Sequence, residues 1–288
     1  MSRPGQIAEP GQPRLMLLAP QHANVPPAFR NSRYDAELHE QLLAGMQRLR
    51  GNVYVQDGAI DPAELSADGR HRLRIDLDSW HLLAIDHYGA VCGCVRYCAH
   101  ACTTSFQQLW VGHSALASSP IWGGRLRSAV ESGLRQSRTR NVAYVEVGGW
   151  AIEPHRRSTT EALHLALATY SLARALGGCI GLTTATTRHH SSSILRRLGG
   201  SSLESMGEAL PPYYDPHFQC DMEVLCFDSE RPAPKYLELV DRLRSEILEA
   251  PVIGAGKPHV QWRHALEPGS LPLRTPPSYG EMASGAHA

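Results

Sequence analysis

The sequence predicts a mixed α/β (α+β) domain with irregular arms at both ends. Segments whose apolar residues recur at helical spacing alternate with short apolar runs that favour strands. The expected order is helix, antiparallel strands, helix, strand, helix, strand, helix, strand and a last helix, which is typical of a sheet covered by helices. Hydrophobic residues make up 42% of the 288 residues, enough for a sizeable core.

The first half is expected to hold a helix and a hairpin. Ser32 and Asp35 are typical of a helix start, and apolar residues then share one helical face. Residues 72–78 alternate between apolar and polar side chains, which predicts a strand. Two further apolar runs flank the turn sequence at 86–89 and predict a β-hairpin over residues 81–97.

The second half is expected to alternate helices and strands, with Gly-Gly pairs as breaks. In order, these elements are a helix over 126–134, a strand over 142–147, a helix over 158–176, a strand over 179–184, a helix over 191–198, a strand over 222–227 and a helix over 236–247. The ends, residues 1–30 and 253–288, are rich in Pro and Gly and are expected to be irregular. Residues 31–252 would then form the domain.

Composition excludes several classes of function. The 28 basic and 28 acidic residues cancel, so no overall field favours nucleic acid or an anionic membrane. No apolar run approaches the roughly 20 residues of a membrane span, and no charged start with an apolar block predicts a secretory signal. The 7 cysteines lack framework spacing, which fits a reducing compartment. We therefore expect a cytoplasmic protein with neither a nucleic-acid partner nor a membrane span.

A cluster of cysteines around the second hairpin strand raises the question of a metal site. Cys92, Cys94 and Cys98 would share one side of a strand, where a thiol behaves as a small apolar side chain. The paired Cys-x-x-Cys knuckles of zinc sites are absent. We therefore expect no metal.

Four motifs in the domain carry a resemblance to a known family. They contain Arg50 near the end of the first helix, Asp76 and Asp78 ahead of the hairpin, Arg96 in its second strand, and Glu146 in the strand after the second helix. Their order and spacing resemble the GNAT acyltransferase superfamily, and within it the acyl-homoserine lactone (autoinducer) synthases and the long-chain N-acyl amino acid synthases. The resemblance implies a GNAT fold, in which a central, mixed, mostly antiparallel twisted sheet is flanked by helices.

The chain departs from the autoinducer synthases directly after Glu146. Those enzymes carry an arginine shortly after the corresponding glutamate, whereas Gly148-Gly149-Trp150 stands here. This difference disfavours a homoserine lactone product. The segment from Tyr213 to Glu223 is more similar to the N-acyl amino acid synthases.

The start of the third expected helix is the predicted donor site. Arg156, Arg157, Ser158, Thr159 and Thr160 match the phosphate loop of the superfamily, with threonine in place of its first glycine. Free N–H groups and the helix dipole would bind phosphate, and the arginines would add charge-assisted hydrogen bonds. Without that glycine, a single phosphate fits more easily than a pyrophosphate. The alternative is a Ser/Thr-capped helix with exposed arginines.

The resemblance implies a transient acyl donor and no bound cofactor. The donor would be the phosphopantetheine of an acyl carrier protein or an acyl-CoA, and the acceptor a small-molecule amine. Carrier proteins are acidic, so a basic face would dock one. The arginines expected to form that face are Arg156, Arg157, Arg188, Arg196 and Arg197.

Glu146, Gly148 and Gly149 are the predicted catalytic residues. A carboxylate in a buried strand is costly without a partner or a task, and the task would be to position or deprotonate an amine. The alternative is a structural salt bridge, for example with Arg96. Glycines inside a strand favour a bulge over a plain turn. A bulge would direct a backbone N–H to the thioester carbonyl and open a slot for the pantetheine arm.

Arg50, Asp76, Asp78 and Arg96 are expected to form a charged network near the acceptor. In the resembling families the matching residues order the acceptor pocket, and an arginine fork suits the carboxylate of an amino acid. The alternative is a network that is structural only.

Taken with the resemblance, these features predict an N-acyltransferase that moves an acyl chain from a thioester to the amine of a small molecule, with an amino acid as the best-fitting acceptor. Three alternatives stay open. They are an acyl-homoserine lactone synthase that uses S-adenosylmethionine, an acetyl-CoA-dependent N-acetyltransferase, and a non-catalytic GNAT-fold binding protein.

Overall fold

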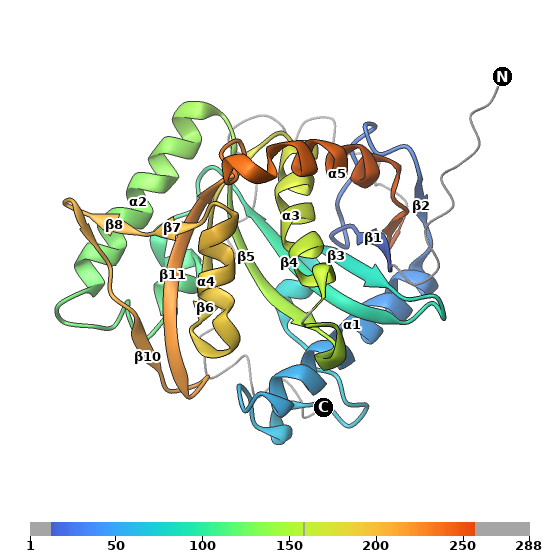
Figure 1. Ribbon diagram of the computed structural model, residues 1–288, viewed down its shortest axis with the longest axis horizontal. Helices are drawn as coiled ribbons and strands as arrows, with labels where there is room; N and C mark the ends of the chain where they lie inside the picture. Colours follow the sequence, from blue (N-terminus) through green and yellow to red (C-terminus); the bar gives the residue numbers. More distant parts are fainter. Residues whose placement is uncertain (1–12, 158, 257–288) are drawn as a thin grey trace.

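One ten-stranded sheet runs through the centre of the molecule (Figure 1). The computed structural model describes residues 13–157 and 159–256, apart from the side chain of His189. The strands are β1 Arg14–Leu18, β2 Ser32–Tyr34, β3 Trp80–Ile85, β4 Val91–His100, β5 Ala143–Ile152, β6 Cys179–Thr186, β7 Ser201–Ser202, β10 Tyr213–Asp215, β11 Cys220–Asp228 and β12 Val252–Gly254. Their order is β10-β11-β6-β5-β4-β3-β1-β12-β2, with β7 on β11.

Most neighbouring strands in this sheet are antiparallel. The parallel pairs are β5 with β6, β1 with β12, and β12 with β2. The prediction of a mixed, mostly antiparallel sheet is therefore confirmed. A separate small hairpin is formed by β8 (Glu204–Ser205) and β9 (Glu208–Ala209).

Helices cover both faces of the sheet. The α-helices are α1 Ala36–Gln56, α2 Gly123–Arg140, α3 Thr160–Ala175, α4 Ser191–Leu198 and α5 Leu237–Glu249. Leu82 packs into the cluster that holds α3 and α5, whereas its neighbour Leu83 packs into the cluster that holds α1. Val145 and Tyr144 divide in the same way between the α3 side and α2. This alternation follows from the two-residue period of a strand.

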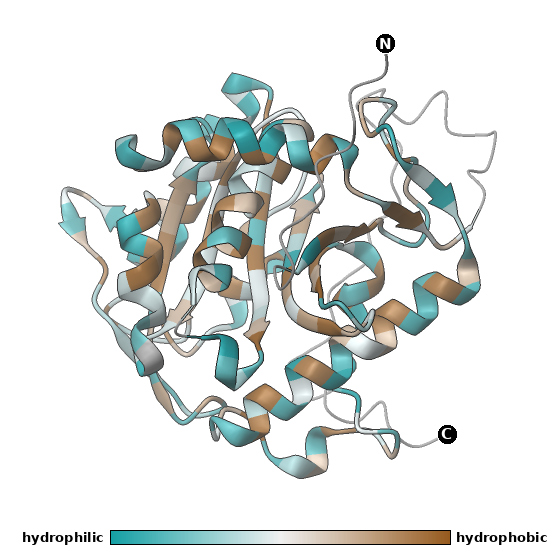
Figure 2. Cartoon of the chain, turned by 45° about the vertical axis from the view of Figure 1, so that its right-hand side comes forward, coloured by the Kyte–Doolittle hydropathy of each residue, from teal (hydrophilic) through white to brown (hydrophobic). Residues whose placement is uncertain are grey.

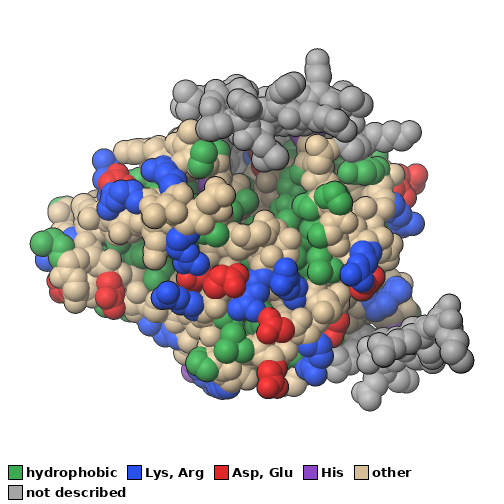
Figure 3. Space-filling view, turned by 90° about the horizontal axis from the view of Figure 1, so that it is seen from above, with side chains coloured by type: hydrophobic (Ala, Val, Ile, Leu, Met, Phe, Trp, Pro, Cys, Tyr) green, Lys and Arg blue, Asp and Glu red, His purple; other side chains and the backbone are tan. Residues whose placement is uncertain are grey.

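The surface agrees with the balanced composition. Figure 2 shows the apolar residues concentrated along the central strands, while hydrophilic residues recur along the outer helices. On the face seen in Figure 3, acidic and basic side chains are intermixed. Within the described residues, no helix is long and apolar enough to cross a membrane, and no group of three or more His, Cys, Asp or Glu side chains has the arrangement of a metal site.

Two predictions about local structure are wrong. The segment expected to be irregular up to residue 30 contains β1, which lies inside the sheet between β3 and β12. The strand expected over 72–78 is a 3₁₀ turn, η2 (Arg74–Asp78), because the buried Asp76 side chain accepts a hydrogen bond from the N–H of Leu73. Near the other end, β12 begins at the predicted domain boundary, and residues 1–12 and 257–288 lie outside the described residues.

Candidate active site

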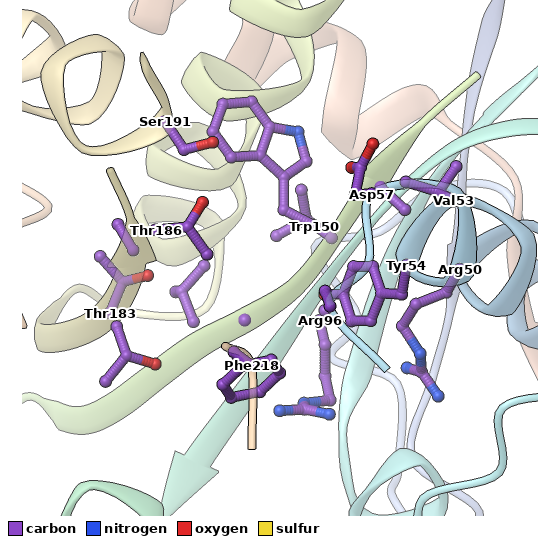
Figure 4. A pocket seen from close by; sticks show the side chains of 18 of the residues that line it. Arg50, Val53, Tyr54, Asp57, Arg96, Trp150, Thr183, Thr186, Ser191 and Phe218 are labelled. Atoms are coloured by element: carbon purple, nitrogen blue, oxygen red, sulfur yellow. The ribbon is translucent and has the colours of Figure 1, made fainter. Parts of the chain in front are cut away.

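A large cavity opens where two parallel strands part. The pairing of β5 with β6 runs from Ala143 opposite Cys179 to Val147 opposite Thr183. Beyond this point, a cavity of about 2200 Å³ is lined by residues from both strands and from α1, β4, α3, α4 and β11. Figure 4 shows Trp150 and Arg96 among the side chains that line it. The cavity therefore has walls on both faces of the sheet.

The two glycines of β5 lie in a bulge at the edge of this cavity. Arg96 of β4 pairs with Gly148, but Cys94 pairs with Ala151, so β5 carries an extra residue between these positions. Gly149 has a φ of 61°, a backbone conformation that favours glycine. A bulge is therefore present, and β5 continues through it to Ile152 instead of turning away.

The bulge changes which side chains reach each face. Before it, Val145 and Val147 pack on the α3 side of the sheet. After it, Trp150 and Ile152 pack on that same side, while Ala151 joins the α1 cluster. The extra residue thus brings Trp150 to the α3 wall of the cavity.

Replacing Gly149 with alanine is expected to destabilise the protein by about 1–2 kcal/mol, because an L-residue is strained at this φ. The new Cβ would also lie 3.3 Å from Cβ of Arg96 and 3.4 Å from Nη1 of Arg50. Urea unfolding measures the change. Gly124→Ala in α2 is the control, since its Cβ would meet nothing within 4 Å and no loss of stability is expected. Equal stabilities for the two variants would contradict the strain.

Glu146 is held firmly beside the bulge. Its carboxylate accepts hydrogen bonds from the backbone N–H groups of Trp110 (3.0 Å) and Val111 (2.9 Å), at the start of the 3₁₀ turn η4 (Trp110–His113). Nε2 of His100, at the end of β4, lies 2.9 Å from Oε2 of Glu146. The side chain is 11% exposed and lines the cavity. Glu146 therefore contacts η4 and His100, and not Arg96 as in the structural alternative.

Arg50 and Asp76 form a fully buried ion pair. Nη1 of Arg50 donates to Oδ1 of Asp76 (2.8 Å) and Nη2 donates to Oδ2 (2.7 Å), with both side chains 0% exposed. Burial alone would raise the pKa of Asp76, but the charge and hydrogen bonds of Arg50 hold it well below its usual range. Gln47 and the N–H of Leu73 also donate to Asp76. This pair fits the structural alternative.

Asp78 does not join this network. It is exposed at the last position of η2. Residues two apart share one side of a strand but not of a 3₁₀ turn, so Asp76 is buried and Asp78 is directed elsewhere. The error in predicting the strand is thus the reason for the error in placing Asp78.

Arg96 lies next to the buried pair and retains capacity to donate hydrogen bonds. Its side chain is 12% exposed, and its Nη1 lies 3.7 Å from Oδ1 of Asp76, beyond hydrogen-bond distance. Within the described residues, its buried Nε and Nη1 have no hydrogen-bond partner. The guanidinium lies 5.8 Å from the ring centroid of Trp110. A cation with free donors at a cavity wall is suited to an anionic ligand.

The arginines of the predicted phosphate loop already donate to carboxylates of this chain. Arg156 donates to Glu153 (3.0 Å) and to Glu161 (2.9 Å). Thr159 is the N-cap of α3 and accepts from the N–H of Glu161 (3.2 Å). Thr160, the first residue of α3, is exposed, and Ser158 lies outside the described residues.

The five arginines expected to form a docking face also donate within this chain. Arg157 donates to Asp57, and Arg196 to Glu223. The acceptors for the others are the carboxylates of Glu153 and Glu161 for Arg156, backbone oxygens of Asp57 and Gln219 for Arg188, and Ser193 for Arg197. Carboxylates therefore offset the charges of Arg156, Arg157 and Arg196, whereas Arg188 and Arg197 donate to uncharged oxygens.

Some residues of the site carry no signal in the sequence. His100 and Trp110 contact Glu146 only because β4 and η4 fold beside β5. Asp57, the C-cap residue of α1, meets Arg157 from 100 residues away. A single histidine, tryptophan or aspartate without a motif could not have been singled out.

No protein-family model matches the sequence, and no curated protein matches it. Among solved structures, the chain is similar to the CoA-dependent acyl-homoserine lactone synthase MesI, with 17% identity, coverage of 81% of this chain and 95% of that chain, and a TM-score of 0.47. It is also similar to the CoA-dependent acyl-homoserine lactone synthase BjaI (17% identity, 83% and 92% covered, TM-score 0.46). A third is FeeM, an N-acyl amino acid synthase from uncultured soil microbes (13% identity, 76% and 92% covered, TM-score 0.42). Their names fall in the two groups that the motifs resemble. At such identities the likeness concerns the fold and leaves the reaction to be argued from the site.

Proposed function

We propose that this protein is an N-acyltransferase that moves an acyl chain from the thioester of an acyl carrier protein or an acyl-CoA to the amine of a free amino acid. One observation carries the proposal. Glu146, a carboxylate, and Arg96, a guanidinium with unpaired donors, line the same cavity at the β5 bulge. An amino acid presents an amine and a carboxylate, which these two groups complement.

The two side chains project from the same face of the sheet. Val95 and Val145 both pack on the α3 side, so the next residues, Arg96 and Glu146, project to the opposite side. Trp110 connects them, since its ring lies against Arg96 and its backbone N–H donates to Glu146. An acceptor held by Arg96 would therefore have its amine close to Glu146.

The donor would enter through the opening between β5 and β6. Beyond the end of their pairing, apolar side chains line the cavity on the α3 side, which suits an acyl chain and the pantetheine arm. They include Trp150, Ile152, Ala166, Tyr170 and Phe227.

All seven cysteines are free thiols, and we place the reaction in the cytoplasm, where thiols stay reduced.

The proposed reaction needs one proton transfer and one addition to a carbonyl. Glu146 takes a proton from the acceptor ammonium, and the free amine attacks the thioester carbon. A backbone N–H at the bulge donates to the oxyanion that forms. The carbon–nitrogen bond stays, the carbon–sulfur bond breaks, and the sulfur leaves as a thiolate, which an ordinary thiol pKa of about 8.5 permits. The nitrogen loses a second proton as the amide forms, and this proton, released to solvent, balances the negative charge of the thiolate.

Mass spectrometry of products tests the proposal. The purified protein would be incubated with acyl carrier proteins and acyl-CoAs of several chain lengths, pooled amino acids and S-adenosylmethionine. An N-acyl amino acid is the expected product. Arg96→Lys should raise the KM for the acceptor, since an ammonium cannot replace the guanidinium fork. An acyl-homoserine lactone, or no product from folded protein, would contradict the proposal.

A further inference from the structure

Three cavity residues from distant parts of the chain meet at the end of α1. Asp57 accepts two hydrogen bonds from Arg157, 2.9 Å to Oδ1 and 2.8 Å to Oδ2. Its backbone oxygen also accepts from Arg188 of η6 (Arg188–His190). All three residues line the cavity, and Figure 4 shows Asp57 and Trp150 among its side chains. The contact therefore joins α1 to the segments before α3 and before α4.

The carboxylate of Asp57 occupies the fork of Arg157 as two phosphate oxygens would. A guanidinium offers parallel N–H donors to either anion with the same planar geometry. Asp57 is 19% exposed and Arg157 is 29% exposed, so the pair is only partly screened by water. A phosphate that approaches Arg157 must displace this carboxylate or lie beside it.

The surroundings add no surplus positive charge. Arg156 is bound by both Glu153 and Glu161. The three arginines of this region, Arg156, Arg157 and Arg188, are thus equalled in number by three carboxylates, those of Asp57, Glu153 and Glu161, although Arg188 itself donates to the backbone oxygen of Asp57. This region therefore has no net positive charge to attract a donor with several phosphates. Its three carboxylates would also repel such a donor.

We propose that Asp57 determines which acyl donor the enzyme accepts, by disfavouring the polyanionic CoA and leaving a carrier-bound phosphopantetheine as the substrate. CoA would bring a pyrophosphate and a 3′-phosphate to this part of the cavity, whereas the phosphopantetheine of the carrier brings a single phosphate. The inference rests on the proposed acyl transfer and names the residue that selects its donor.

Steady-state kinetics of Asp57→Asn with matched acyl-CoA and acyl carrier protein tests this role. Asparagine removes the charge and keeps a side-chain oxygen for Arg157, and the cap of α1 uses the backbone N–H of residue 57, so the fold is retained. The KM for acyl-CoA is expected to fall roughly tenfold, because one like charge leaves this part of the cavity. The KM for the carrier-bound donor should stay within about twofold. Glu161→Gln, which partly releases Arg156, should shift the ratio of kcat/KM values in the same direction.

Glu238→Gln is the control, since it removes the same charge from an exposed position on α5. If the contact were purely structural, its loss would change kcat/KM for both donors alike. An unchanged ratio of the two kcat/KM values in both Asp57→Asn and Glu161→Gln would therefore overturn the role of Asp57 and leave acyl transfer in place. A wild-type protein that prefers acyl-CoA would overturn it as well. Absence of turnover with either donor would overturn the proposed function and this inference together.

Discussion

Glu146→Gln is expected to lower kcat on the order of 10²–10⁴-fold, because an amide cannot accept the proton of the acceptor ammonium. The carboxylate already accepts hydrogen bonds from the N–H groups of Trp110 and Val111, so its position is fixed before substrate binds. Preorganisation of this kind places the lost rate in the chemical step and not in binding. The KM for the acceptor should therefore change much less than kcat. Product formation by mass spectrometry over time measures both.

The substitution also touches the structure, and the control has to separate the two effects. The glutamine amide cannot satisfy both N–H groups of η4, so some stability is lost with the charge-assisted hydrogen bonds. Urea unfolding of Glu146→Gln shows whether the assay uses folded protein. Glu223→Gln is the matched variant, since it breaks an ion pair with Arg196 outside the β5 bulge and should keep kcat. A Glu146→Gln enzyme with normal kcat would remove Glu146 from the chemistry.

Much of the fold could be predicted because local patterns determine it. The turn at 86–89 joins β3 to β4, and Asp35 caps α1 by accepting from the N–H of Leu38. The glycine pair in β5 indicated the bulge, since glycine alone adopts the φ of Gly149 without strain. These features depend on residues that are neighbours in the chain.

The features that could not be predicted depend on distant partners. The strand β1 is short, and it exists because β3 and β12 pair with it on either side. Alternation over 72–78 favoured a strand, but the buried Arg50 binds Asp76 there and a 3₁₀ turn satisfies that carboxylate. The candidate site shows the same limit, since the position of Glu146 was predictable and its contact with His100 was not. Long-range electrostatic contacts outweigh local propensity at these positions.

Asp76→Asn is expected to destabilise the protein by about 3–5 kcal/mol, because it leaves the fully buried charge of Arg50 without its counter-ion. The asparagine oxygen can replace one carboxylate oxygen as an acceptor. The asparagine NH₂ group would take the place of the other oxygen, which in the wild type accepts hydrogen bonds from Gln47 and from the N–H of Leu73, so donors would face donors. Urea unfolding followed by circular dichroism measures the loss. Asp68→Asn is the control, since Asp68 pairs with Arg72 at the surface, where water screens the ion pair and its loss should change the stability little.

The same pair makes part of the stability depend on pH. The pKa of Asp76 is lower in the folded protein than in the unfolded chain, so its contribution is complete above the unfolded value of about 3.9 and declines as the pH falls below it. The free energy of unfolding of Asp76→Asn should therefore fall less steeply below about pH 4 than that of the wild type. Parallel curves would show that the carboxylate is not the group that Arg50 stabilises. Because Arg96 lies 3.7 Å from Asp76 and loses this competing negative charge, the folded fraction of the variant should also bind the carboxylate of the acceptor more tightly, whereas Asp68→Asn should not. A loss of stability with unchanged acceptor affinity would separate the buried pair from the site and leave Arg96 to act without it.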